Sequence, residues 1–273
     1  MKLGGYKRIE EIDFGALYRS HKALNGDRIK SAKDWDKRAE KMGEKMAGDG
    51  LYNDYIKSKV DLSGAQTMLE IGCGAGTFSL AFAPYLEKIY AFDFSGEMLK
   101  ILRELQKQKG LTNIVSFQAD IEGDWAIAPK CDIVIASRCM EVADMKSVLK
   151  QIDDHAQKAV YITAKVGKSF LHNELLEVLE RKVVGRPDYI YILNILFEMG
   201  IYAKVDFAPI GDPQNDPPKT KAAFIEAIAG MSDNLSKEEE KRAADYFDRC
   251  LSEGKTPRFR NDSWALISYE KSL

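Results

Sequence analysis

Short apolar runs alternate with helical patterns through the middle of the chain, from Gln66 onward. The runs are rich in Ile, Val, Leu and Phe, which is typical of buried strands. Between them apolar residues recur at helical spacing, and Ser95 and Asp144 stand where N-caps are expected. Strands that alternate with helices predict a parallel sheet covered on both faces. The five predicted strands are Met68–Ile71, Ile89–Phe92, Ile114–Phe117, Asp132–Ala136 and Ala159–Thr163.

The alternation of single strands and single helices ends after the fifth strand. Two strongly apolar helical segments precede a strand, and prolines from Pro209 to Pro218 then mark a loop. Further on, Ser236 and Glu239 form a capping box at the start of a helix. We therefore expect helical insertions among the last strands. The predicted helices are 170–183, 189–199, 220–231 and 236–254, and the predicted strands are Ile201–Phe207 and Trp264–Tyr269.

An amphipathic helix is predicted ahead of the sheet, over residues 27–47, because Trp35, Ala39, Met42 and Met46 recur at helical spacing. Trp35 and its neighbour Arg38 have two interpretations. They can cover a ligand at the edge of the sheet, or they can be ordinary packing and a solvated charge.

Composition excludes several classes of protein. With 45% hydrophobic and 30% charged residues, the chain of 273 residues has ordinary globular usage. Its net charge of −2 provides no positive field for nucleic acid or anionic membranes. No run approaches the roughly 18 to 20 apolar residues of a membrane span, and the first residues lack the apolar core of a signal peptide. We expect a cytoplasmic protein without a membrane partner.

Cysteine and histidine usage does not indicate a metal site. The four cysteines form no CxxC pair, and the three histidines are scattered along the chain. Reduced thiols, mostly buried, are the simplest interpretation.

A glycine-rich segment carries the chemistry. The strand at Met68–Ile71 runs directly into Gly72, Gly74 and Gly76, where the backbone can turn tightly and a ligand can lie against bare peptide. Asp93 ends the next strand, where a carboxylate can accept hydrogen bonds from both ribose hydroxyls of a nucleoside. Together these features predict a nucleoside-containing cofactor.

The spacing separates two enzyme classes that use this arrangement. A dinucleotide fingerprint needs a small residue at Thr77, whereas the glycines here follow the pattern E-x-G-x-G-x-G. Leu69–Thr77 resembles the first motif of the class I S-adenosylmethionine-dependent methyltransferases. Further segments resemble the later motifs of that family, namely Phe92–Ser95 with Met98, Gln118–Asp120 and Asp132–Ser137.

This resemblance implies S-adenosylmethionine as cofactor and S-adenosylhomocysteine as product. It implies that the backbone at Gly72, Cys73 and Gly74 approaches the methionine part of the cofactor, with Glu70 nearby. Asp93 would hold the ribose hydroxyls.

The resemblance also implies an adenine site and a position beside the sulfonium. Phe94 and Met98 would flank the adenine, Asp120 would accept from its N6 amine, and Ile121 would donate its backbone N–H. Ser137 would lie beside the sulfonium. Each of these residues also has a structural interpretation, as core or turn.

The implied fold is a doubly wound, mostly parallel seven-stranded sheet, the Rossmann-like methyltransferase fold, with an antiparallel last strand. We expect one domain over 1–273. Its predicted parts are a helical cover over 1–60, a cofactor-binding core over 66–165, helical insertions and the sixth strand over 166–260, and the last strand over 261–273.

Methyl transfer needs alignment and exclusion of water more than a dedicated base, so the sequence names no catalytic residue. A small-molecule acceptor is favoured, because apolar insertions suit a closed chamber. An RNA or protein methyltransferase is the alternative, supported only by the basic patches 219–221 and 258–260. A non-catalytic cofactor-binding protein is the third. His172, Tyr189, Tyr191 and Asn194 are candidates to line a pocket, or else buried core residues.

Overall fold

A computed structural model describes residues 8–25, 30–46, 50–181, 184–208, 218–231, 235–261 and 263–271. Most of the predicted proline-rich loop lies outside these residues. Within the described part of the chain, no helix combines the length and the apolar character that a membrane span requires.

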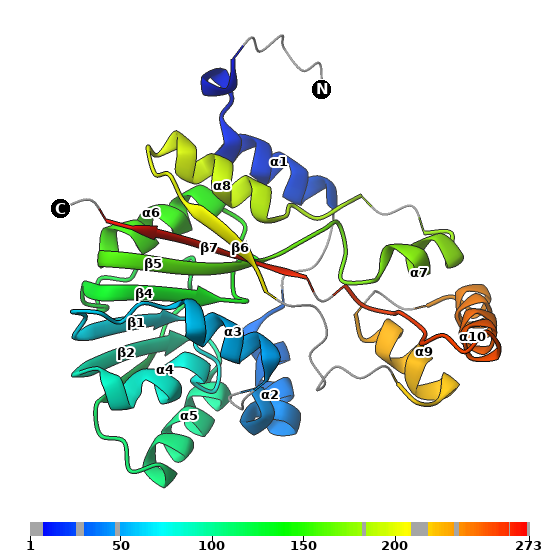
Figure 1. Ribbon diagram of the computed structural model, residues 1–273, viewed down its shortest axis with the longest axis horizontal. Coiled ribbons are helices and arrows are strands. Elements are labelled where there is room, and N and C mark those ends of the chain that lie inside the picture. The colour runs from blue at the N-terminus through cyan, green and yellow to red at the C-terminus, as the bar shows by residue number, and fades with distance from the viewer. Residues whose placement is uncertain are drawn as a thin grey trace.

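One seven-stranded sheet forms the centre of the molecule, in the order β3-β2-β1-β4-β5-β7-β6 (Figure 1). All strands run parallel except β7, which pairs antiparallel with both β5 and β6. The structure thus confirms the predicted parallel core and the antiparallel last strand. The strands are β1 (Thr67–Ile71), β2 (Lys88–Asp93), β3 (Ile114–Gln118), β4 (Cys131–Ser137), β5 (Ala156–Lys165), β6 (Lys204–Phe207) and β7 (Trp264–Glu270).

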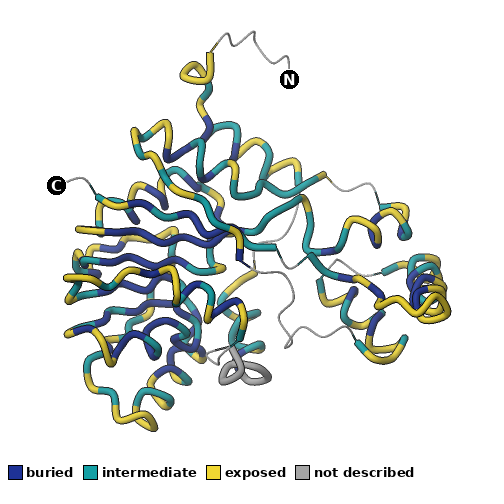
Figure 2. The backbone as a smooth tube through the Cα atoms, viewed as in Figure 1, coloured by how far each residue is buried: buried dark blue, intermediate teal, exposed yellow. Residues whose placement is uncertain are grey.

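Helices cover both faces of this sheet, because alternate strand residues are apolar on each side. Met68 and Ile133 pack toward α3, α4 and α5, whereas Leu69 and Val134 pack toward α6 and α8. The strands are accordingly the most buried part of the chain (Figure 2). The layer helices are α3 (Leu51–Lys59), α4 (Thr77–Phe82), α5 (Gly96–Gln108), α6 (Met145–His155) and α8 (Tyr189–Glu198).

The two amino-terminal helices take different positions. Helix α1 (Phe14–Asn25) packs on α6 and α8, where Tyr18 donates a hydrogen bond of 2.6 Å to the backbone oxygen of Val142. Helix α2 (Ala32–Met46) packs instead on α5 at the carboxyl edge of the sheet. Of these two helices, only α2 lies where a ligand of the glycine loop would be covered.

Three helices form a separate lobe that faces the carboxyl ends of the parallel strands (Figure 1). The lobe has its own apolar core, built around Leu175, Phe224 and Phe247. The capping box predicted at Ser236 and Glu239 is present at the start of its longest helix. The helices are α7 (Asn173–Val178), α9 (Lys221–Ala229) and α10 (Lys237–Ser252).

The two helices predicted before the sixth strand therefore belong to different parts of the molecule. Leu171, Leu175 and Leu179 are buried in the lobe, whereas Ile192 and Leu196 are buried on the sheet. Helix α8 is thus an ordinary layer helix, because its apolar face matches the open flank of the sheet beside α6.

Candidate functional site

Three glycines follow β1, and a Cβ atom would meet different surroundings at each. At Gly72 it would lie 2.5 Å from the Cβ of Cys139, and at Gly76 it would overlap the side chain of Leu102. At Gly74, whose φ is +51°, no atom of the described chain lies within 4 Å of that position. Gly72 and Gly76 therefore serve close packing, and Gly74 alone presents bare backbone to open space, as a bound ligand requires.

The carboxylate of Asp93 organises this loop from the end of β2. One of its oxygens accepts from the N–H of Gly74 at 2.8 Å, and the other accepts from the N–H of Ser95 at 2.9 Å. The side chain is 7% exposed, and burial raises its pKa. Each oxygen retains a lone pair, so Asp93 can hold the glycine loop and also accept from ribose hydroxyls.

The carboxylate of Glu70 is engaged by the helix that follows the glycine loop. Its buried carboxylate accepts from the N–H groups of Phe78 at 3.1 Å and Ser79 at 2.7 Å, and from the hydroxyl of Ser79. Burial raises its pKa to about 7. Glu70 therefore fixes the start of α4 beneath the glycine loop, and any effect on a cofactor is through that loop.

Two predicted adenine contacts lie on either side of the β2–α5 turn. Met98 is 1% exposed and packs with Ala39 and Ala75 between α2 and α5, so its side chain is core. Phe94 is half-buried, and its backbone oxygen accepts from the side-chain amide of Gln118 at 2.8 Å. Phe94 is thus the more accessible of the two.

Asp120 and Ile121 follow β3 at the same edge of the sheet. Asp120 is exposed, and its carboxylate accepts from the N–H of Glu122 at 2.9 Å in a tight turn. Ile121 is half-buried, and its backbone oxygen accepts from the indole N–H of Trp125 at 3.1 Å. The turn holds the Asp120 carboxylate at the surface, where its second oxygen can accept from a ligand.

Helix α2 is tied over this region by Asp36. Its carboxylate accepts from the hydroxyl of Ser95 at 2.6 Å and from the N–H of Glu97 at 3.3 Å. On the next turn the guanidinium of Arg38 stacks 5.1 Å from the centre of the Trp35 ring. Trp35 is half-buried and packs against the cluster of Ala39, Ala75 and Met98, as the packing interpretation predicts, and its role as a cover stays a prediction.

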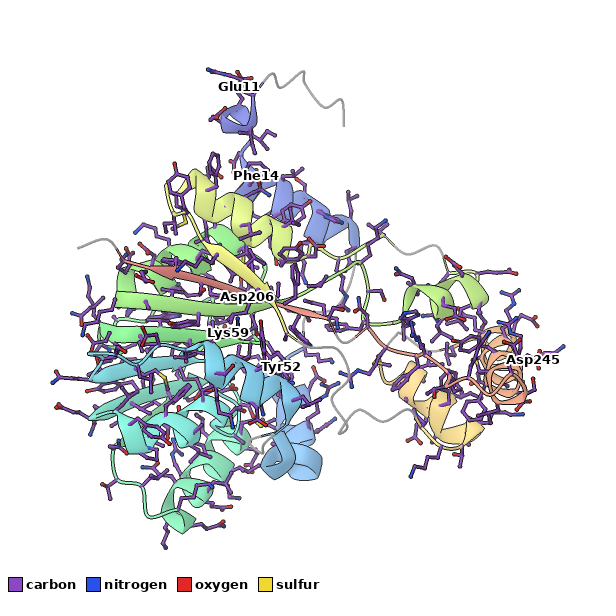
Figure 3. All side chains as sticks on the ribbon, viewed as in Figure 1. Glu11, Phe14, Tyr52, Lys59, Asp206 and Asp245 are labelled. Atoms are coloured by element: carbon purple, nitrogen blue, oxygen red, sulfur yellow. The ribbon has the colours of Figure 1, made fainter. Side chains whose placement is uncertain are left out.

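A buried hydroxyl network closes the exits of β4 and β5. The hydroxyl of Tyr52, on α3, lies 2.9 Å from Ser137 Oγ and 2.7 Å from Thr163 Oγ1. Tyr52 lies where the strands end, on the side of the lobe (Figure 3). Burial raises its pKa above the ordinary value, so its hydroxyl remains protonated at neutral pH. Of these three residues the sequence predicts only Ser137 as a site residue, although Thr163 carries a signal, being polar at the end of an apolar strand.

The other pocket candidates lie apart from one another. The ring of His172 accepts from the N–H of Glu174 at the start of α7, and Asn194 donates to a backbone oxygen within α8. Tyr189 packs against Phe207, and Tyr191 contacts His21 on α1. The structure therefore does not bring these four side chains together.

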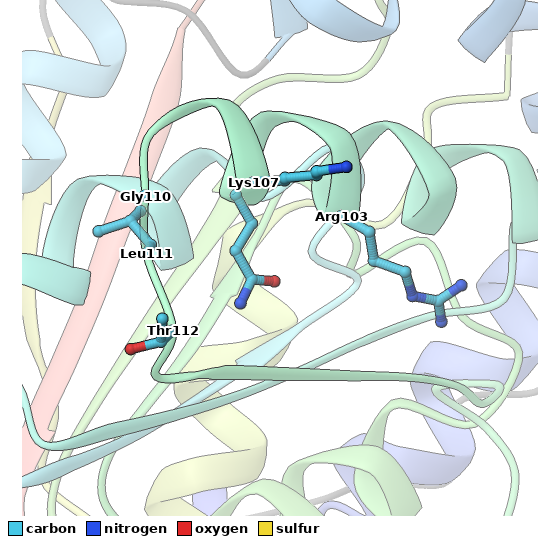
Figure 4. Close-up of a pocket in the computed structure, with 6 residues that line it drawn as sticks. Arg103, Lys107, Gly110, Leu111 and Thr112 are labelled. Atoms are coloured by element: carbon cyan, nitrogen blue, oxygen red, sulfur yellow. The ribbon is translucent and has the colours of Figure 1, made fainter.

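A surface depression of about 370 Å³ lies at the far end of α5. It is lined by Arg103, Gln106, Lys107 and the residues that precede β3 (Figure 4). Because α5 runs away from the glycine loop, this depression lies at the amino edge of the sheet and belongs to no part of the candidate site. No group of three or more metal-binding side chains occurs among the described residues.

Comparisons with known proteins agree with this geometry. A family model described as a methyltransferase domain matches residues 68–158. The chain is 31% identical over 263 residues to an uncharacterized protein of Haemophilus influenzae, covering 95% of this chain and 97% of that protein. It is 27% identical over 120 residues to an uncharacterized RNA methyltransferase of Protochlamydia amoebophila, covering 41% of this chain and 26% of that protein.

A solved structure shows the same fold. It is a phosphoethanolamine N-methyltransferase of Haemonchus contortus, in complex with phosphomonomethylethanolamine and S-adenosylhomocysteine. The likeness has a TM-score of 0.55 and 17% identity, and it covers 90% of this chain and 61% of that chain.

Proposed function

The chain belongs to the class I S-adenosylmethionine-dependent methyltransferases, and on this premise we propose that it methylates a small-molecule acceptor. The observation that carries this proposal is that three segments are each tied in place beside the strand exits. Asp36 ties α2 to Ser95, and Tyr52 ties α3 to Ser137. Arg186 lies in the segment between α7 and α8, the lobe linker, and pairs with Glu141 at 2.6 Å. A small acceptor fits the space beside these segments, whereas an RNA stem or a folded protein needs an open face.

The cofactor supplies an electrophilic methyl group that is transferred in line to the acceptor. In the proposed site, the backbone at Gly74 and the carboxylate of Asp93 bind the cofactor. Ser137, Tyr52 and Thr163 form a fixed polar floor at the exits of β4 and β5. Their task is to orient the reactants and to exclude water, which is what methyl transfer requires of an enzyme.

The macromolecular alternative has weaker support. The match to the RNA methyltransferase covers 26% of that protein's length, so most of that protein lies outside the match. Of the two short basic patches, Lys221 is paired with Asp248, and Phe259, between Arg258 and Arg260, is buried in the lobe core. Neither patch supplies a continuous positive face. A cytoplasmic place of action is part of the proposal, since all four cysteines are unpaired.

A transfer assay with labelled cofactor tests the proposal. The full chain is incubated with methyl-labelled S-adenosylmethionine and, separately, with a small-molecule ultrafiltrate of cells, total RNA and total protein. We expect label in the ultrafiltrate, and we expect less of it with Gly74→Ala than with the wild type. Label that enters only RNA or only protein would refute the small-molecule acceptor while leaving the methyltransferase assignment intact.

A further inference from the structure

Arg138, directly after Ser137 at the exit of β4, has an unusual backbone conformation. Its φ is +57°, in the left-handed region that costs a side-chain-bearing residue about 1 kcal/mol or more. Three contacts hold it there. Its N–H donates to Thr163 Oγ1 at 2.9 Å, its guanidinium lies 4.3 Å from the centre of the Tyr52 ring, and one of its nitrogens donates to Asn53 at 3.3 Å.

These contacts fix the direction of the guanidinium and leave most of its donors unused. A guanidinium has five N–H donors in a planar fork, and one of those of Arg138 reaches Asn53. Arg138 is exposed, and among the described residues no carboxylate forms an ion pair with it. An arginine that is held in place, charged and open to the reaction space is preorganised for a planar or tetrahedral anion.

A second cation, Lys165, lies at the end of β5, the strand next to β4. The Tyr52 ring packs edge-on against Trp264 with centroids 6.0 Å apart. The ammonium of Lys165, at the end of β5, lies 5.1 Å from the Trp264 ring and 5.5 Å from the Phe170 ring. Aromatic side chains thus link the positions of Arg138 and Lys165.

A third cation, Arg186, lies in the lobe linker. Arg186 stacks 4.4 Å from the centre of the Phe170 ring and pairs with Glu141, three residues after Arg138. Arg138, Lys165 and Arg186 therefore lie along one series of aromatic and ion-pair contacts beside the strand exits. Of these three cations Arg138 is the exposed one, at the exit of β4, so its guanidinium is the group on which an anion would be favoured.

We propose that the methyl acceptor carries an anionic group, a carboxylate or a phosphate, and that Arg138 binds this group in a bidentate manner. The inference rests on the proposed small-molecule function and adds the chemical class of the acceptor. Because Arg138 follows Ser137 directly, an anion held by Arg138 would place the rest of the acceptor at the exit of β4.

Probe binding tests the anion site without knowledge of the acceptor. Benzoate and phenyl phosphate, with uncharged benzamide as control, are titrated calorimetrically into the chain saturated with S-adenosylhomocysteine. We expect one or both anions to bind and benzamide not to bind. In Arg138→Gln the affinity should fall at least about tenfold, the scale of a lost charge-assisted hydrogen bond, while S-adenosylhomocysteine affinity is retained.

Arg103→Gln is the matched control, because Arg103 lies at the amino edge of the sheet and donates to Ser116 at 3.0 Å. It should bind the anions like the wild type. Equal binding of benzamide and benzoate to the wild type overturns the proposal even if Arg138→Gln fails to fold. Unchanged anion affinity in a folded Arg138→Gln overturns it as well. The relative strength of the two anions separates a carboxylate site from a phosphate site.

Transfer to a fractionated ultrafiltrate separates this inference from the proposed function. Methylated product that is retained on an anion exchanger, and lost with Arg138→Gln but not with Arg103→Gln, supports both. Methylated small molecules that pass through the exchanger refute the anionic acceptor and leave the small-molecule function standing. Label found only in RNA or protein, or in no fraction, refutes the proposed function itself.

Discussion

Gly74→Ala, compared with Gly110→Ala, separates ligand binding from backbone strain. Both glycines have positive φ, +51° and +66°, and at both a Cβ would meet no described atom within 4 Å. Gly74 lies at the proposed cofactor site, whereas Gly110 ends α5 at the opposite edge of the sheet. The two substitutions therefore impose the same kind of strain and differ only in what occupies the open space.

The strain should cost each variant about 1 kcal/mol of unfolding free energy, the difference between alanine and glycine in the left-handed region. At Gly74 the added methyl group would also enter the space of the cofactor. Forcing an extra methyl into a packed contact costs about 1 to 3 kcal/mol, so the affinity for S-adenosylhomocysteine should fall about 5- to 150-fold. At Gly110 the affinity should not change.

Urea unfolding gives the stabilities, and isothermal titration calorimetry with S-adenosylhomocysteine gives the affinities. Two results would refute the reasoning. A folded Gly74→Ala that binds like the wild type would mean that the cofactor does not approach this loop. Equal affinity losses in both variants would mean that the effect comes from general destabilisation.

Three further predictions concern carboxylates. In Asp93→Asn the amide can accept only one of the N–H groups of Gly74 and Ser95, so S-adenosylhomocysteine affinity should fall by about 1.5 to 3 kcal/mol; calorimetry against the exposed control Asp124→Asn checks this. Burial raises the pKa of Glu70 from 4.5 to about 7 in the folded state, which therefore binds this proton more tightly than the unfolded state does. Glu70 thus lowers the free energy of unfolding as the pH rises from about 4.5 to 7. Glu70→Gln should flatten that part of the stability profile, measured by urea unfolding at each pH, and an unchanged slope would contradict the assignment. Asp36→Ala should raise the dissociation rate of S-adenosylhomocysteine about five- to tenfold by releasing α2 from Ser95; stopped-flow competition would show no change if α2 does not cover the cofactor.

The sheet was predictable from the sequence because its strands are buried on both faces. Such strands read as continuous apolar runs, and six of the seven predicted runs lie within observed strands. The exception is the run Ile201–Phe207, because β6, at the edge of the sheet, begins only at Lys204. Helices with a cap and one apolar face, such as α5 and α6, were predictable for the same reason. Helices α1 and α3 were not predicted, because the face that each buries includes a tyrosine, Tyr18 or Tyr52, whose hydroxyl bonds to a part of the chain far away in sequence.

The candidate site was predictable where a residue type is dictated by local geometry. Gly74 lies in the loop after β1 and Asp93 at the end of β2, so their spacing along the chain identifies both of them. Tyr52 and Arg138 come together only because α3 packs on the sheet. Tyr52 lies 85 residues before Ser137, the last residue of β4, and the two hydroxyl groups are in contact. The family resemblance places Glu70 near the cofactor, and only the structure shows that its carboxylate accepts from the start of α4.

A crystal structure of the full chain with S-adenosylhomocysteine tests the central claim most directly. The account predicts the ribose hydroxyls on the carboxylate of Asp93, the amino-acid part against the backbone at Gly74, and the sulfur directed toward Ser137 and Arg138. A cofactor bound at another edge of the sheet would contradict the site. A sulfur that faces an open surface away from Arg138 would contradict the enclosed acceptor space.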